Sequence, residues 1–208
     1  MSDLEKAIQL AVKAHTGQMD EDGMPHIVHC FTVMANVQKE ANRTAIEGVS
    51  VGELLISAVL HDTVEDSSVT LAEIRSMFGA HPEGGKTIGE VVAEIVDAVS
   101  RRKDESYRDF IYRAKAHPGA RLVKIADLLA NMGRLNTIPA KKASWRNKLE
   151  FKYATALSVL NDSSEPTWEQ ASYSVQSEGP HKHYFVADPN GKKIEVTEEE
   201  FKSLMGKK

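Results

Sequence analysis

Residues 54–66 read LLISAVLHDTVED, an apolar run that ends in one imidazole and three carboxylates. The apolar residues predict a buried helix from about Val51 to Asp62. Placing His61 and Asp62 at the end of such a helix costs several kcal/mol unless the charge is compensated. A divalent metal ion compensates it, because neutral imidazole and carboxylate groups are its ligands. The stretch therefore indicates a metal site and an enzyme.

The chain up to about residue 160 is predicted to be all-α. Apolar residues recur there at helical spacing, and no alternating pattern of a strand interrupts them. Two capping boxes, Ser2 with Glu5 and Thr70 with Glu73, mark helix starts. The expected helices span residues 2–15, 27–40, 51–62, 70–79, 89–100, 107–116, 119–135 and 145–160.

The composition changes at residues 161–166, NDSSEP, which are typical of a polar linker. Two β-prone runs follow, 183–187 and 193–196, on either side of the turn sequence Asp-Pro-Asn-Gly. They predict a β-hairpin, with a short terminal helix starting at Thr197. We therefore expect a helical domain over 1–160 and an appendage over 161–208. His181 and His183 in this appendage are more typical of surface residues than of metal ligands.

Composition excludes several classes of protein. The 208 residues carry a formal net charge of −4, which argues against the concentrated basic surface that nucleic-acid binding requires. No apolar run approaches the ~20 residues of a membrane span. The single cysteine rules out an intramolecular disulfide, and the charged N-terminus lacks a signal sequence. A cytoplasmic protein that acts on a small molecule is expected, and homo-oligomerisation is left open.

Two further residues are candidate ligands, His29 and Asp127. Each has a simpler explanation when taken alone. His29 fits a core or capping histidine. Asp127 fits an exposed helix pair with Lys124, three residues earlier, which is worth a few tenths of a kcal/mol. Their combination with His61-Asp62, in order and each at the edge of an apolar helix, favours a shared metal site instead.

The chain resembles a known protein family. His29, His61-Asp62 and Asp127 match the H…HD…D signature of HD-domain phosphohydrolases. Further matches make the series similar to the hydrolase domain of RelA/SpoT-type enzymes, and especially to the short stand-alone alarmone hydrolases. These matches are AHxGQ at 14–18, GxP at 23–25, HDxxED at 61–66 and KxADxxxN at 124–131.

The resemblance covers about residues 1–160. It implies an all-α HD-domain bundle and one divalent ion of the Mn²⁺ type. It also implies removal of the 3′-pyrophosphate from guanosine tetra- or pentaphosphate. His29, His61, Asp62 and Asp127 would hold the ion.

The same resemblance suggests roles for the polar residues near these ligands. Glu65 and Asp66 follow the His-Asp pair by about one helical turn, so they would orient or deprotonate the attacking water. The other implied residues would contact the nucleotide. They are Asn131, Lys124, Arg134 and Gln18.

The sequence departs from the family pattern in one loop. The family's basic pair after Gly-Gln is replaced by acids, Asp20 and Glu21, and each acid disfavours the binding of a polyanion by ~1 kcal/mol. His26 stands in place of a tyrosine, and Cys30 in place of a proline. Two alternatives therefore stay open. One is an HD hydrolase of another nucleotide or phosphoester, and the other is a non-catalytic regulatory module.

Overall fold

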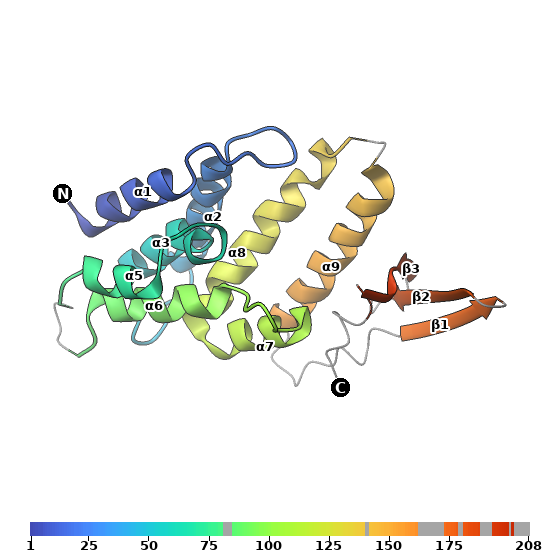
Figure 1. The fold of residues 1–208 in the computed structure, drawn as a ribbon. Helices are drawn as coiled ribbons and strands as arrows, with labels where there is room; N and C mark the ends of the chain where they lie inside the picture. Colours follow the sequence, from blue (N-terminus) through green and yellow to red (C-terminus); the bar gives the residue numbers. More distant parts are fainter. Residues whose placement is uncertain are drawn as a thin grey trace.

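The computed structural model describes residues 1–80, 85–139, 142–161, 173–178, 181–187, 193–199 and 201. These residues form a bundle of helices followed by a small antiparallel sheet (Figure 1). The elements are α1 (Asp3–Ala14), α2 (His26–Ala41), α3 (Val51–Leu60), α4 (Thr63–Asp66), α5 (Leu71–Met77), α6 (Ile88–Val99), α7 (Tyr107–Ala116), α8 (Pro118–Arg134), the 3₁₀ turn η1 (Leu135–Thr137), α9 (Ala143–Asn161), β1 (Tyr173–Glu178), β2 (His181–Ala187) and β3 (Lys193–Val196).

Helix α3 lies at the centre of the N-terminal half. It packs against α1, α2 and α6, and seven of its ten residues are buried, in line with its apolar sequence. A capping box of Ser50 and Glu53 fixes its start. The two capping boxes predicted from the sequence, at Ser2 and Thr70, are confirmed as well.

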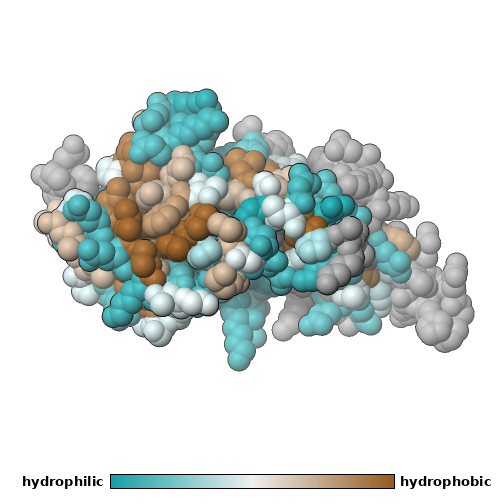
Figure 2. All heavy atoms as spheres, turned by 90° about the horizontal axis from the view of Figure 1, so that it is seen from above, coloured by the Kyte–Doolittle hydropathy of each residue, from teal (hydrophilic) through white to brown (hydrophobic). Residues whose placement is uncertain are grey.

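The hydrophobic core has three adjoining parts. One joins α2, α3, α6 and α8, and a second joins α1, α2, α3, α5 and α6. The third joins α7, α8 and α9 and includes Val196 of β3. Figure 2 shows brown, hydrophobic side chains gathered on one part of the face seen from above. Val12 of α1 and Met19 are among the large apolar side chains that are exposed. None of the helices in the described ranges is long and apolar enough to cross a membrane.

Helices α5 and α6 approach each other closely at Gly89. A Cβ atom added there would lie 2.2 Å from the backbone oxygen of Arg75, so no side chain fits. This contact fixes the start of α6 against α5. Beyond the other end of α6, the backbone nitrogen of Arg101 donates to Glu65 of α4.

The C-terminal appendage contains the predicted hairpin and one strand more. Strands β2 and β3 pair antiparallel, with Tyr184 opposite Val196, which confirms the expected hairpin. Strand β1 pairs with β2 and was not predicted, so the sheet order is β1-β2-β3. Helical backbone at 198–199 and 201 follows β3, where a terminal helix was expected. The predicted linker lies almost entirely outside the described residues.

Candidate metal and substrate site

His61 and Asp62 occupy the junction between α3 and α4. The sequence predicted a helix that runs to Asp62. In the structure α3 ends at Leu60 and α4 starts at Thr63, so the predicted C-terminal end of this helix was wrong. The hydroxyl of Thr63 donates to the carbonyl oxygen of Leu60, which helps the chain turn. The turn matters because successive residues of a continuous helix point about 100° apart. It lets both side chains face the same point.

Four side chains meet at that point, the predicted ligands His29, His61, Asp62 and Asp127. His61 Nε2 lies 2.9 Å from Asp62 Oδ2, and His29 Nε2 lies 3.1 Å from Asp127 Oδ1. The two remaining imidazole–carboxylate distances are 3.6 and 3.7 Å. Bond lengths of about 2.1 Å place neighbouring ligands of an octahedral ion roughly 3 Å apart. The cluster therefore has the dimensions of a metal site.

The protonation of His61 also suits a ligand. Its Nδ1 lies 2.8 Å from the carbonyl oxygen of Ala58, which only accepts, so Nδ1 carries the proton and Nε2 the lone pair. Nε2 is buried and has no hydrogen-bond partner within the described ranges. Such an orphaned acceptor beside two carboxylates fits a metal ion.

A buried cation balances one side of this cluster. Lys124 Nζ donates to Asp127 Oδ2 at 2.7 Å, and Asn131 donates to Oδ1 of the same carboxylate at 2.6 Å. Burial is the largest influence and raises the pKa of Asp127, but the ammonium group of Lys124 and the imidazoles of His29 and His61 together hold that pKa well below its usual range. The alternative of an exposed Lys124–Asp127 pair was wrong, because both side chains are largely buried.

Glu65 and Asp66 stand beside the cluster, on α4. Glu65 Oε2 accepts a hydrogen bond of 2.8 Å from the backbone nitrogen of Arg101. The pKa of both carboxyl groups is raised, mainly because burial removes part of their hydration. The negative charge of the neighbouring Asp62 raises both pKa values further. A raised pKa improves a carboxylate as a proton acceptor.

Gln18 and Arg134 are engaged with the protein. The amide of Gln18 donates to the backbone oxygen of Asp66 at 2.7 Å, so it helps to hold that turn. Arg134 donates to Asp20 and, at 2.7 Å, to Asn131. The acidic loop is thus paired with one of the cations that were expected to meet the nucleotide.

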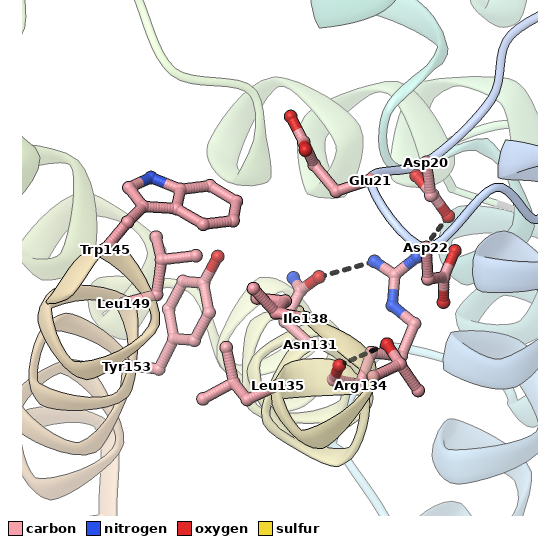
Figure 3. Close-up of a pocket in the computed structure, with 11 residues that line it drawn as sticks. Asp20, Glu21, Asp22, Asn131, Arg134, Leu135, Ile138, Trp145, Leu149 and Tyr153 are labelled. Carbon is pink, nitrogen blue, oxygen red and sulfur yellow. Dashed lines mark hydrogen bonds and ion pairs between the residues drawn. The ribbon is translucent and has the colours of Figure 1, made fainter. Parts of the chain in front are cut away.

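A cavity of about 220 Å³ opens between this loop and α9 (Figure 3). Trp145 and Tyr153 of α9 line one side, and Asn131 and Arg134 of α8 face them. Asp20, Glu21 and Asp22 close the cavity at the far side. Flat aromatic rings opposite polar groups suit a heterocyclic base, because bases stack on aromatic side chains with about 1–3 kcal/mol each.

A second cavity of about 560 Å³ lies between α7, α9 and the residues after β3. Its charged lining residues are three bases, Arg101, Lys148 and Lys152, and one acid, Glu199. The pKa of Lys152 is lowered to about 8. Burial is the main cause, and the nearby positive charges of Lys124 and Arg101 contribute. The cavity therefore offers positive charge next to Glu65 and Asp127.

Sequence reasoning missed the residues on α9. Trp145, Leu149 and Tyr153 recur every four residues, as do Lys148 and Lys152, so each set shares a face of the helix. That spacing was visible, but it did not show that these faces of α9 line two cavities. His26 and Cys30 were noticed only as departures from a pattern.

Comparisons with known proteins agree with this geometry. The HD domain family matches residues 26–132. The mouse guanosine-3′,5′-bis(diphosphate) 3′-pyrophosphohydrolase MESH1 is 36% identical over 136 residues, which cover 64% of this chain and 69% of that protein.

Longer proteins match over part of their length. The guanosine-3′,5′-bis(diphosphate) 3′-pyrophosphohydrolase of Aquifex aeolicus is 30% identical over 141 residues, which make up 18% of that protein. A solved structure of a metazoan SpoT orthologue that hydrolyses ppGpp superposes with a TM-score of 0.61. It covers 77% of this chain and 85% of its own, at 22% identity, so it supports the fold.

Proposed function

This chain belongs to the HD-domain family of metal-dependent phosphohydrolases, and we propose that its substrate is guanosine-3′,5′-bis(diphosphate), ppGpp. The observation that carries the proposal is the buried cluster of two imidazoles and two carboxylates, followed on α4 by Glu65 and Asp66. The similarity to MESH1 supports the choice of substrate. We infer a cytoplasmic enzyme, as expected for a small-nucleotide hydrolase.

The metal site is proposed to consist of His29, His61, Asp62 and Asp127. These groups fit an ion, since Nε2 of His61 is buried beside two carboxylate oxygens without a hydrogen-bond partner in the described part of the chain. Two nitrogen and two oxygen ligands suit Mn²⁺, with positions left for water and a phosphate oxygen. A bound ion would polarise the phosphoryl oxygen and lower the pKa of water.

Carboxylate side chains of the protein would accept the proton that the attacking water releases. We assign Glu65 and Asp66 as the acceptors of the proton of the attacking water, because their raised pKa and their position on α4 suit that task. The backbone nitrogen of Arg101 holds the carboxylate of Glu65 in place. Lys124 holds Asp127, which keeps the negative charge of that ligand compensated.

The two cavities suggest how the nucleotide lies. The guanine base would stack beside Trp145 and Tyr153, where Asn131 and Arg134 supply polar contacts. The diphosphate that is not cleaved would extend to the basic cavity, near Lys152. This arrangement keeps the phosphates away from the acids of loop 20–22. The substitution of the family's basic pair by acids is then compatible with a polyanionic substrate.

A second candidate is an HD hydrolase with another nucleotide or phosphoester as its substrate, favoured by the acidic residues Asp20, Glu21 and Asp22 at the cavity. A screen of the purified chain with Mn²⁺ against ppGpp, common nucleotides and generic phosphoesters separates the two. We expect release of pyrophosphate from ppGpp at the highest rate. A preference for another phosphoester by more than tenfold would favour the second candidate.

Variants test the mechanism separately from the substrate. His61→Ala and Asp62→Ala are expected to lose both bound metal and hydrolysis. Glu65→Gln is expected to keep the metal and lose hydrolysis, since it removes only a proton acceptor. Full metal content in the unaltered chain with no hydrolysis of any phosphoester would instead indicate the regulatory module.

A further inference from the structure

His26 links one carboxylate of the proposed metal site to the acidic loop. Nε2 of His26 lies 3.1 Å from Oδ2 of Asp62, and Nδ1 lies 2.8 Å from Oδ1 of Asp20. Carboxylate oxygens only accept, so both ring nitrogens donate and the ring carries a positive charge. None of the three side chains is more than 19% exposed, so water screens these contacts little. One cationic ring therefore holds a loop residue and a ligand carboxylate together.

The same loop residue continues the series of hydrogen bonds to the other carboxylate of the site. The second oxygen of Asp20, Oδ2, accepts from the guanidinium group of Arg134. Arg134 also donates to Oδ1 of Asn131 at 2.7 Å, and the amide nitrogen of Asn131 donates to Oδ1 of Asp127 at 2.6 Å. An unbroken path thus runs from one carboxylate to the other. We call it the carboxylate belt, and its members in order are Asp62, His26, Asp20, Arg134, Asn131 and Asp127.

The backbone of the loop fixes Asp20 at the centre of this belt. The backbone nitrogen of Asp20 donates to the carbonyl oxygen of Met24 at 2.8 Å, and that of Gly23 donates to the carbonyl oxygen of Asp20 at 2.9 Å. The turn has a φ of +80° at Gly23, a conformation that favours glycine. Where the loop meets α2, the backbone nitrogen of His26 donates to the carbonyl oxygen of Gln18 at 3.0 Å. A closed turn thus presents the carboxylate of Asp20 to both cations.

The charges along the belt alternate in sign around Asp20. Its carboxylate lies between two cations, the ring of His26 and the guanidinium group of Arg134. Without a carboxylate at position 20, these cations would lie close together as like charges and would lose the acceptor that orients them. Outer hydrogen bonds of this kind orient the ligands of a metal ion, and their loss typically weakens metal binding by about 10–100-fold. Asp20 is therefore the member on which both arms of the belt depend.

We propose that Asp20 is a positioning residue of the metal site, which holds both carboxylate ligands in place through the carboxylate belt. The inference rests on the proposed metal site but not on the identity of the substrate. It gives the departures from the family pattern at positions 20 and 26 a common reason, because an acid at 20 accepts from a histidine at 26 and a basic residue could not. The two cations also compensate the charge of Asp20, which therefore opposes a polyanionic substrate less than an unpaired acid would.

The affinity of the full chain for Mn²⁺ tests the belt without any substrate. The chain is stripped with a chelator and titrated with Mn²⁺ in a calorimeter, and circular dichroism checks that each variant is folded. Asp20→Asn is nearly isosteric and leaves one cation without its acceptor, so we expect the Kd for Mn²⁺ to rise about tenfold. Glu21→Gln is the matched control, because it removes the same charge from the next residue, which pairs with Lys142 outside the belt. Its Kd should change by less than about twofold.

Arg134→Met separates the belt from simple electrostatics. Removal of a positive charge near the site would by itself strengthen the binding of a cation, whereas a broken belt weakens it. We expect the Kd for Mn²⁺ to rise about tenfold in this variant as well. The double variant with Asp20→Asn should bind Mn²⁺ little more weakly than either single variant, because both changes interrupt the same path.

The possible outcomes distinguish the belt from the metal site itself. Unchanged or tighter Mn²⁺ binding in Arg134→Met overturns the proposal, and so do equal effects of Asp20→Asn and Glu21→Gln. If one belt variant does not fold, the other decides by the same criterion. Failure of the unaltered chain to bind Mn²⁺ would overturn the proposed metal site and the role of the belt with it, whereas loss of affinity confined to the belt variants supports both.

Discussion

The two cavities beside the metal cluster share a wall but differ in charge. Trp145 and Leu149 line both of them. Beyond this wall, one cavity meets the acids of loop 20–22 and the other meets Arg101, Lys148 and Lys152. A charged cleft raises the local concentration of ligands of the opposite sign. The difference therefore gives a polyanionic nucleotide one favourable orientation, with its free phosphates on the basic side.

The His/Asp cluster, which lines neither cavity, should show the largest effect. In Asp127→Ala, Lys124 is left as an unpaired buried charge, so we expect a loss of about 3–5 kcal/mol in the free energy of unfolding. Urea denaturation in the presence of a chelator measures this without the metal. Asp97→Ala is the control, because its pair with Arg102 is exposed and worth about 0–1 kcal/mol. Equal losses in the two variants would show that Lys124 does not need its partner.

The basic cavity should contribute next. We expect Lys152→Met to raise KM for ppGpp about tenfold, which corresponds to ~1.4 kcal/mol of lost phosphate binding. Lys142→Met is the matched change on the acidic side, where Lys142 pairs with Glu21. It should alter KM by less than about twofold, since exposed pairs contribute little. Similar effects of both changes on KM would contradict the proposed orientation of the substrate.

The pH dependence of Lys152 gives two trends of opposite sign. Its pKa is about 8 in the folded chain and near 10.5 when unfolded, so the unfolded chain binds more protons between these values. Stability should therefore rise with pH over that interval. Substrate affinity should fall over the same interval, because the side chain loses its charge. Denaturation and KM, both measured from pH 7.5 to 10, check this, and Lys152→Met should weaken both trends.

The proposed metal ligands and the cavities differ in how well sequence alone predicts them. His29, His61, Asp62 and Asp127 were found because polar residues at the ends of apolar helices are unusual, and because their order matches a family. The helix after Val51 was extended too far, since periodicity does not register a break between two consecutive helical segments. Lys148 and Lys152 were missed because a lysine on a helix is ordinarily exposed. Only the packing of α7, α8 and α9 turns them toward the site.

The acidic side should show the smallest effect. Glu21 is largely exposed and pairs with Lys142, so its charge is screened by water and partly neutralised. We expect Glu21→Gln to lower KM for ppGpp by about twofold at low salt, with no difference at high salt. Kinetics at two salt concentrations measure this. A drop of tenfold or more would mean that the phosphates lie against loop 20–22 after all. The charge difference between the cavities would then oppose substrate binding instead of orienting it.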